Sequence, residues 1–460
     1  MPRLISPMLL VAALALPCSS FAQADNSCGG TPCVQKDVEV ARADAGRVRV
    51  AVDAANPARL AIAATDHDVC GANIIHFTQD DGATWSHSCT MWGVWDDEGP
   101  VEAPVVAFDK QGELIAVQSF YWGSDGGTVR ASRSTDGGQT WDGWSTVASS
   151  LYYRGWVRST QLKIDGSPAS PYRGRMYASF TDDAGNKARI RVASSDDSGH
   201  NWAPVNVTPL ATGNEMLDFS DLAIGRDGSL YLSYLSCFGA DRSRDRDCHD
   251  QPAELRFVRS TDGGQSWSKP AALAQTMLPP GRALTDFQWM HSYGALPGTK
   301  AAVSFTPVIA VDLSEGPHQN RLYMVMTTYA EKRLQVLLIT SDDQGASWSA
   351  PRPVATGPLG ADQFMPWISV SRQGVVAVTW MDQRKHPQLP DYQPMVAFSS
   401  DGGDTFSAPE VLQGQASPAT ALRDLSSIAS HTWAGQRLKT AFIGPDAAGA
   451  PTVRLSTAKP

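Results

Sequence analysis

The residues best suited to chemistry gather in three segments that combine carboxylates with histidine, arginine or aromatic side chains. These are residues 237–250 (Asp241, Asp245, Asp247, His249, Asp250), residues 286–293 (Asp286, Trp289, His291, Tyr293) and residues 382–391 (Asp382, Arg384, His386, Asp391). Carboxylates can bind sugar hydroxyls, and aromatic rings offer flat faces to the C–H groups of a sugar. The three segments therefore predict carbohydrate binding, with solvated loops of variable length as the alternative.

Several residues could carry acid, base or nucleophilic roles. Hydrolysis of a glycoside needs one acid to protonate the leaving oxygen and a second group as base or nucleophile. We select Asp362 and Asp382 as the first carboxylate pair to test, with Tyr329 or Tyr293 as a tyrosine nucleophile. A lyase acting on a uronic acid polysaccharide would use a histidine or tyrosine base instead, and His291 is available for that role.

Arginines and tryptophans supply the candidate substrate-binding groups. A guanidinium can hold a carboxylate through two parallel hydrogen bonds, so an acidic sugar would be bound by arginine. The candidates are Arg154, Arg158, Arg384 and Arg423, and bridging of adjacent structural units is the alternative for Arg384. Among the tryptophans, Trp122 and Trp289 have the context of ligand-binding loops, whereas most of the others are expected to pack in the core.

We expect no cofactor. Asp241, Asp245, Asp247 and Asp250 have the composition of a calcium-binding loop without its ordered spacing, and the interspersed Arg242, Arg244 and Arg246 could neutralise them. A structural calcium ion is kept as an alternative. The segment 66–68 (Asp-His-Asp) offers no third metal ligand at a recognisable spacing, so we expect a polar turn there.

Six copies of one eight-residue pattern, Ser/Thr-x-Asp-x-Gly-x-x-Trp/Phe, must position these residues. The copies are 78–85, 134–141, 195–202, 260–267, 341–348 and 399–406. Within each copy the hydroxyl opens a turn, the aspartate accepts backbone N–H groups, the glycine supplies a positive φ, and the aromatic ring folds back onto the preceding strand. Each copy therefore predicts a self-contained clasp between two strands, with a structural aspartate.

The six copies resemble the BNR, or Asp-box, repeat of the family that includes sialidases, and the resemblance covers nearly all of the mature chain. It implies an all-β propeller and a sialidase-like glycoside hydrolase acting on an acidic sugar or polysaccharide. Sialidases are typically six-bladed, and their N-terminal Arg-Ile-Pro segment has no counterpart here, which removes one of three arginines that hold the sialic acid carboxylate. A non-catalytic propeller that binds glycan or protein, and a uronic-acid polysaccharide lyase, are therefore kept as alternatives.

The repeated aspartates recur roughly every 60 residues, which gives room for a four-stranded unit with loops. Residues 424–457 contain further strands without a box, and residues 38–40 could supply a missing fourth strand. We therefore predict six Asp-box blades and a seventh closing blade, with six blades as the alternative. In such blades the boxes lie on one face of the ring. The loops between second and third strands and the links between blades gather on the opposite face, which we call the mouth.

Composition and the N-terminus define the class of protein. The chain has 460 residues, 42% hydrophobic and 18% charged, with a formal charge of -9 and no basic run, which argues against nucleic acid and membrane surfaces as partners. Residues 1–22 have the order of a secretory signal peptide, so residues 23–460 should form one exported propeller domain, secreted or periplasmic, which we expect to be monomeric. Six cysteines remain after cleavage, and their proximity predicts the disulfides Cys28–Cys33, Cys70–Cys89 and Cys237–Cys248.

Overall fold

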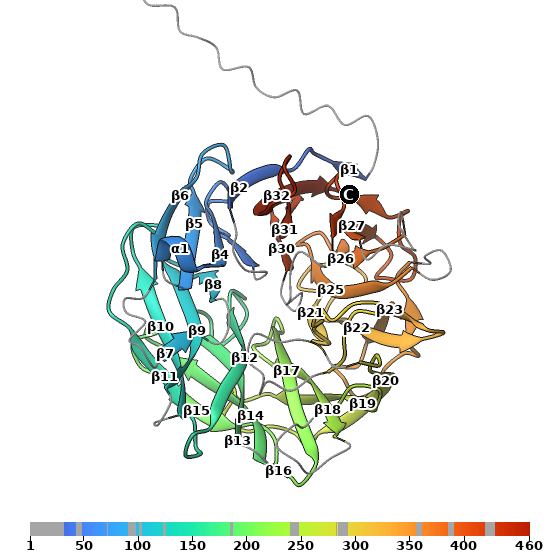
Figure 1. Cartoon of the computed structure of the whole chain (residues 1–460). Helices are drawn as coiled ribbons and strands as arrows, with labels where there is room; N and C mark the ends of the chain where they lie inside the picture. Colours follow the sequence, from blue (N-terminus) through green and yellow to red (C-terminus); the bar gives the residue numbers. More distant parts are fainter. Residues whose placement is uncertain are drawn as a thin grey trace, which may run out of the picture.

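Seven antiparallel sheets stand around a central axis in the computed structural model of the chain (Figure 1). The structure describes residues 32–42, 48–70, 72–90, 98–100, 104–122, 126–184, 187–239, 248–281, 283, 293–355, 361–384, 391–418 and 428–460. Each sheet has four or five strands and runs from the axis to the rim. The all-β prediction and the preferred number of seven blades are confirmed, and the six-bladed alternative is wrong.

The first three blades follow one another along the chain. Blade 1 contains β3 (Val48–Val52), β4 (Leu60–Asp66), β5 (Ala72–Thr78) and β6 (Ser86–Cys89), with the short helix α1 (His67–Cys70) after β4. Blade 2 contains β8 (Val105–Phe108), β9 (Leu114–Trp122), β10 (Gly126–Ser134) and β11 (Ser145–Ser149), and β7 (Glu98–Pro100) also pairs with β9. Blade 3 contains β12 (Trp156–Ile164), β13 (Met176–Ala184), β14 (Lys187–Ser195) and β15 (Ala203–Asn206), and β16 (Ala211–Thr212) also pairs with β14.

The next three blades repeat the same order. Blade 4 contains β17 (Glu215–Ile224), β18 (Leu230–Phe238), β19 (Pro252–Ser260) and β20 (Ala271–Met277). Blade 5 contains β21 (Val308–Val311), β22 (Leu322–Ala330), β23 (Arg333–Ser341) and β24 (Arg352–Pro353). Blade 6 contains β25 (Gln363–Val370), β26 (Val376–Asp382), β27 (Asp391–Ser399) and β28 (Glu410–Val411), and β29 (Ser417–Pro418) also pairs with β27.

Blade 7 contains strands from both ends of the chain. Its inner three strands are β30 (Ala429–Ala434), β31 (Arg437–Pro445) and β32 (Pro451–Lys459), and its outer strands are β2 (Val38–Arg42) and β1 (Cys33–Val34). β2 runs antiparallel to β32, with Val38 opposite Leu455, and the two lie side by side in Figure 1. This pairing joins the chain ends and covers a strand edge that would otherwise be open to association.

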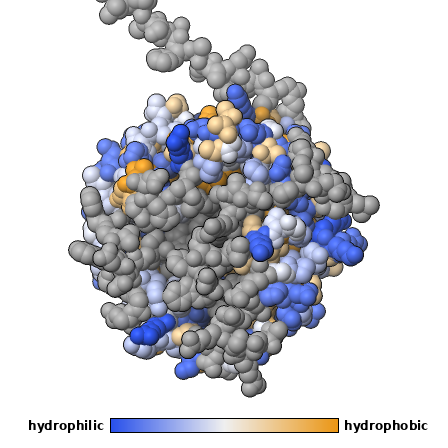
Figure 2. All heavy atoms as spheres, in the orientation of Figure 1, coloured by the Kyte–Doolittle hydropathy of each residue, from blue (hydrophilic) through white to orange (hydrophobic). Residues whose placement is uncertain are grey.

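Apolar side chains lie mainly between the blades. Every residue of β4 and of β26 is buried, because a neighbouring blade covers each face of these second strands. Such strands are accordingly runs of apolar residues, as expected for a sheet that is covered on both faces. The described surface in Figure 2 is mainly hydrophilic at the rim, with small separate apolar patches.

The Asp boxes occupy turns between third and fourth strands, as the turn after β10 illustrates. Ser134 Oγ donates to Asp136 Oδ1 at 2.8 Å, and Thr140 donates its backbone N–H and its hydroxyl to the same carboxylate, at 2.9 and 2.5 Å. In the first box, hydrogen bonds from the Thr78 hydroxyl and from Thr84 lower the pKa of Asp80 to about 2. All these donors belong to the turn that the aspartate closes, which supports a structural role for the box aspartates.

The boxes also connect successive blades. Arg175, at the start of the second strand of blade 3, donates to Asp196 in the box of its own blade and to the Gly263 carbonyl in the box of blade 4. Arg321 makes the same pair of contacts, to Asp342 and to the Gly402 carbonyl, between blades 5 and 6. The face of the ring that carries the boxes, called the box face below, is therefore held together by polar contacts.

Two of the predicted disulfides are present among the described residues, Cys70–Cys89 in blade 1 and Cys237–Cys248 in blade 4. Cys33 is disulfide-bonded as well, and its predicted partner Cys28 lies outside the described residues, as does the predicted signal peptide. The described part of the chain contains no helix long and apolar enough to cross a membrane. The described part also contains no group of three or more residues suited to holding a metal ion. Segment 240–247, which includes Asp241, Asp245 and Asp247 of the calcium alternative, lies outside it.

Candidate functional site

Three inner strands share an irregularity near their N-terminal ends, on the mouth face of the ring. The register shifts between Arg158 and Gln161 in β12, between Asp218 and Asp221 in β17, and between Phe364 and Trp367 in β25. Each bulge contains a non-glycine residue with positive φ: Ser159 at 54°, Phe219 at 57° and Met365 at 53°. Because the left-handed conformation costs on the order of 1 kcal/mol for such residues, and because bulges re-aim side chains, this recurrence marks the mouth side of these blades as a candidate site.

A buried polar cluster joins the first two bulges. Arg158 Nη2 lies 2.5 Å from Asp183 Oδ2 and 3.3 Å from Asp218 Oδ2. The Tyr293 hydroxyl donates to Asp218 Oδ2 at 2.9 Å, and the Ser159 hydroxyl donates to Asp218 Oδ1 at 2.6 Å. We call Arg158, Asp183, Asp218 and Tyr293 the Arg158 cluster. It joins blade 3, blade 4 and, through Tyr293, the link between blades 4 and 5.

The electrostatics of the Arg158 cluster keep the tyrosine protonated. Burial, and then the nearby Asp218 carboxylate, raise the pKa of Tyr293 well above its usual range. The hydroxyl therefore donates to Asp218, which is held in turn by Arg158 and by the hydroxyls of Ser159 and Thr181. A hydroxyl within hydrogen-bond reach of a base, with the base oriented by further groups, is the arrangement that activates a nucleophile.

Arg158 already pairs with two carboxylates of its own chain. Its side chain is 8% exposed, and those of Asp183 and Asp218 are 8% and 3% exposed. A guanidinium in this position orients the two carboxylates and offsets their charge, so binding of a substrate carboxylate by Arg158 stays a prediction. The sequence pointed separately to Arg158 as a binding residue and to Tyr293 as a candidate nucleophile or binding residue, and the structure brings them together on Asp218.

Asp362 forms a second buried centre where blade 6 begins. Its Oδ1 accepts the backbone N–H of Leu334 at 2.6 Å, and burial raises its pKa to about 6. Leu334 pairs with Tyr329 across the hairpin between β22 and β23, so two predicted catalytic residues have a common neighbour. A carboxyl group with a pKa near 6 can hold and release a proton near neutral pH, which is what a general acid requires.

Asp382 has a different set of partners. Its Oδ2 accepts hydrogen bonds from Trp380 Nε1 at 2.7 Å, from Arg384 Nη2 at 2.7 Å and from Gln363 Nε2 at 3.1 Å. No hydrogen bond of the described residues connects its carboxyl group with that of Asp362. The two aspartates lie at neighbouring positions, since the Gln383 N–H donates to the Asp362 carbonyl at 3.0 Å and Gln363 pairs with Asp382, but their carboxyl groups have different partners. Their joint catalytic role stays a prediction, and Arg384 is paired with Asp382.

An aromatic surface adjoins the Arg158 cluster. Tyr121 and Trp156 stack with ring centroids 3.7 Å apart and nearly parallel planes. Tyr153 is 79% exposed, and the guanidinium of Arg154 lies 5.4 Å from its ring centroid. Trp156 and Arg158 are alternate residues of β12, so the aromatic surface and the cluster belong to one stretch of chain. We call Tyr121, Tyr153 and Trp156 the rim aromatics.

Several predicted residues lie outside the described part of the chain. These are His291, Trp289 and Arg423, and the side chain of Trp122, whose backbone ends β9. The sequence analysis missed Asp183 and Asp218. A signal for Asp218 did exist, since it enters blade 4 where Arg158 enters blade 3, but a single aspartate in an apolar strand is not distinctive.

The comparisons with known proteins agree with this geometry at the level of fold. The model of the BNR/Asp-box repeat matches residues 258–269, which contain the box of blade 4. No curated protein sequence matches the chain significantly. The chain therefore contains a BNR/Asp-box repeat, within a propeller of seven blades.

Three similar solved structures illustrate the range of this fold. A polysaccharide lyase of family PL25, an ulvan lyase bound to a glucuronate–sulfated rhamnose unit, is 13% identical, with 91% of this chain and 95% of that chain covered and a TM-score of 0.53. The Hadza microbial sialidase Hz136 is 14% identical, with 87% of this chain and 73% of that chain covered and a TM-score of 0.47. The α-L-arabinofuranosidase Arb93A from Fusarium graminearum is 14% identical, with 93% of this chain and 98% of that chain covered and a TM-score of 0.47.

Proposed function

We propose that the protein is an exported, monomeric carbohydrate-active enzyme, a glycoside hydrolase whose reaction centre is the Arg158 cluster. The observation that carries the proposal is the hydrogen bond of 2.9 Å from the Tyr293 hydroxyl to Asp218, in a cluster held by Arg158. The rim aromatics support a carbohydrate substrate, because stacked and exposed rings suit the apolar faces of sugars.

The proposed roles follow from the contacts. Tyr293 is the nucleophile, and Asp218 takes its proton as the tyrosine oxygen bonds to the anomeric carbon. Asp362, in its protonated form, gives a proton to the leaving glycosidic oxygen. Water then attacks the glycosyl–tyrosine bond, Asp362 accepts a proton from that water, and Asp218 returns the first proton to Tyr293. Arg158 and Asp183 position Asp218.

The remaining predicted residues are assigned to substrate binding. Arg154, Arg384 and Arg423 are the proposed ligands of an acidic group, and Trp122 and Trp289 are proposed to contact sugar rings. His291, Tyr329 and Asp382 stay as alternative proton donors or acceptors near the mouth.

A uronate polysaccharide lyase is the second candidate, because a protonated tyrosine beside a carboxylate also suits proton transfer next to a sugar carboxylate. The fold likeness to an ulvan lyase is compatible with it. In that reaction Tyr293 would exchange a proton with the substrate, and no water would be added to the products.

Product analysis tests these proposals. Residues 23–460 would be incubated with sialosides, arabinosides and uronic acid polysaccharides, and the products weighed by mass spectrometry. A hydrolase adds one water per bond broken, a lyase gives unsaturated products without water, and absence of products from folded protein contradicts both and favours a binding propeller. Tyr293→Phe and Asp218→Asn should lower turnover at least about a hundredfold.

The matched control is Tyr323→Phe. Tyr323 is likewise buried, and its hydroxyl has no hydrogen-bond partner among the described residues, but it lies in β22 near the box face. Turnover by this variant should equal that of the wild type. Equal losses in both tyrosine variants would contradict a role for Tyr293 in the reaction.

A further inference from the structure

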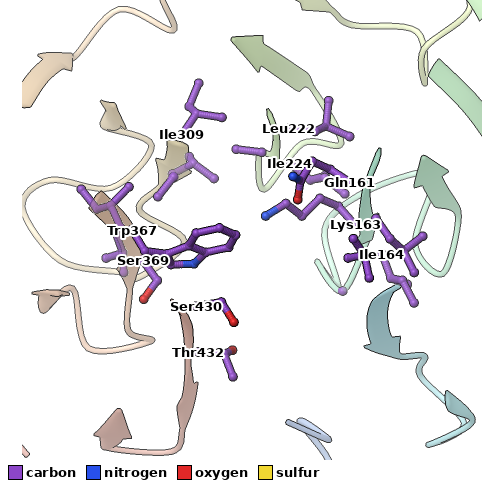
Figure 3. A pocket seen from close by; sticks show the side chains of 18 of the residues that line it. Gln161, Lys163, Ile164, Leu222, Ile224, Ile309, Trp367, Ser369, Ser430 and Thr432 are labelled. Carbon is purple, nitrogen blue, oxygen red and sulfur yellow. The ribbon is translucent and has the colours of Figure 1, made fainter. Parts of the chain in front are cut away.

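A cavity of about 310 Å³ occupies the central channel (Figure 3). It is lined by inner-strand residues of all seven blades. In β12 the lining begins at Gln161 and continues through Ile164 to Ser167, beyond the C-terminal end of the strand. Since first-to-second turns share a face with the box turns, the cavity belongs to the box-face half of the channel.

Two cations, Arg49 and Lys163, line the cavity. The guanidinium of Arg49 lies 5.0 Å from the ring centroid of Trp367. Lys163 extends toward this indole (Figure 3), and its Nζ lies 3.5 Å from Asp221 Oδ1. The other oxygen of Asp221 accepts the Ile309 N–H, so the carboxylate is shared between the lysine and the chain.

Asp165, a carboxylate that lines the cavity, is also engaged. Asp165 accepts hydrogen bonds from the Ser167 N–H at 2.9 Å and from the Ser170 hydroxyl at 2.5 Å. It is 1% exposed. The carboxylate of Asp165 is therefore occupied by its own turn, and the ion pair from Lys163 to Asp221 is long, at 3.5 Å.

The cavity wall also has hydrogen-bonding capacity. Within the described sheets, each inner strand is paired on its outer edge only, so the other edge directs backbone N–H and C=O groups toward the channel. Ser369 Oγ is buried at the wall and has no hydrogen-bond partner among the described residues. Figure 3 shows Ser369 beside Trp367, with Ser430 and Thr432 below them.

We propose that this channel cavity is a second ligand site, and that it binds a single hexuronic acid. The sugar ring would stack on Trp367, its carboxylate would pair with Lys163, and its hydroxyls would bond to Ser369 and to the strand edges. The volume is at the lower end of the range of about 300–1,000 Å³ that is usual for ligand sites, which suits one pyranose. The proposal does not depend on the mouth being catalytic.

Titration calorimetry of residues 23–460 with D-glucuronate tests the site, with D-glucose as the neutral comparison. We expect saturable binding of glucuronate and at least about tenfold weaker binding of glucose, because the glucose lacks the group that pairs with Lys163. Trp367→Ala and Lys163→Met should each weaken glucuronate binding at least about fivefold. Trp367→Phe keeps a ring and serves if the alanine variant does not fold; it should bind with intermediate affinity.

The matched control is Trp144→Ala. Trp144 is 53% exposed and lies under the Arg130 guanidinium, 4.0 Å from the ring centroid, but it does not line the cavity. This variant should bind glucuronate as the wild type does, and so should Tyr293→Phe in the mouth. The proposal is overturned by absence of saturable binding, by equal affinity for glucose, or by binding that is lost in Tyr293→Phe and kept in Lys163→Met and the Trp367 variants.

Discussion

Replacement of Asp362 by asparagine should stabilise the protein above pH 6 and leave its stability unchanged near pH 4. Burial raises the pKa of this carboxyl from its ordinary 3.8 to about 6, so between these values the folded chain holds a proton that the unfolded chain has released. Stability therefore falls as the pH rises through this window. The whole difference corresponds to about 3 kcal/mol. Asparagine imitates the protonated group, and its oxygen can still accept the Leu334 N–H.

The assay is urea unfolding of the wild type and Asp362→Asn, followed by circular dichroism at intervals between pH 4 and 8. The variant should become more stable than the wild type by up to about 3 kcal/mol as the pH passes 6. If Asp362 is the general acid, turnover by the wild type should also fall above pH 6 and turnover by the variant should be lost. A variant that is equally stable or less stable at pH 8, or a difference that does not change with pH, would refute this reasoning.

Asp382→Asn is the matched control for that experiment. Asp382 is equally buried but is paired with Arg384 at 2.7 Å, so its replacement removes one partner of an ion pair. It should destabilise the chain at pH 8, in contrast to Asp362→Asn. Stabilisation of both variants would show that burial of a carboxylate, with or without a cationic partner, decides the outcome.

Three further perturbations have defined outcomes. Arg158→Leu leaves Asp183 and Asp218 without their cation and should cost about 3–5 kcal/mol in urea unfolding at pH 7; a loss below about 1 kcal/mol would contradict the importance of the pair. Burial lowers the pKa of His431 to about 3, so the folded chain excludes a proton that the unfolded chain binds below pH 6.5. The free energy of unfolding should therefore fall on acidification, and His431→Gln should reduce this fall. An unchanged pH profile of stability in the variant would contradict this role of His431. Replacing both Cys237 and Cys248 by alanine removes a disulfide between cysteines 11 residues apart and should lower the free energy of unfolding by about 2–4 kcal/mol relative to the intact protein. Unchanged stability would exclude a role of this disulfide in stabilising blade 4.

Much of the fold could be predicted because its signals are local. An Asp box closes within eight residues, since the opening hydroxyl and the aspartate bond to atoms of the same turn, as Ser134 and Asp136 do. The disulfides Cys70–Cys89 and Cys237–Cys248 also connect cysteines that are near in sequence. Repetition of such units made a ring of blades predictable without any knowledge of contacts between them.

The candidate site could be predicted only in part, because its contacts connect distant residues. Tyr293 and Asp218 are 75 residues apart, and Ser159 and Asp218 are 59 residues apart. Arginine, aspartate and tyrosine are common on loops, so nothing local distinguished Asp183 and Asp218 from solvated residues. The sequence likewise suggested Asp362 and Asp382 as a pair, and only the structure shows that burial raises the pKa of Asp362 while Asp382 is paired with Arg384.

The amino-acid sequence by itself determined the β-propeller class, the positions of the boxes and the proximity disulfides, because each depends on hydrogen bonds or distances within a few residues. The tertiary structure alone decided which residues share a site: the bulges at Ser159, Phe219 and Met365, the pairing of Arg158 with two carboxylates, and the cavity around Trp367. These features arise where separate blades meet around one axis. Burial there changes the pKa of a carboxyl group or a tyrosine, and burial is a property of the assembled ring.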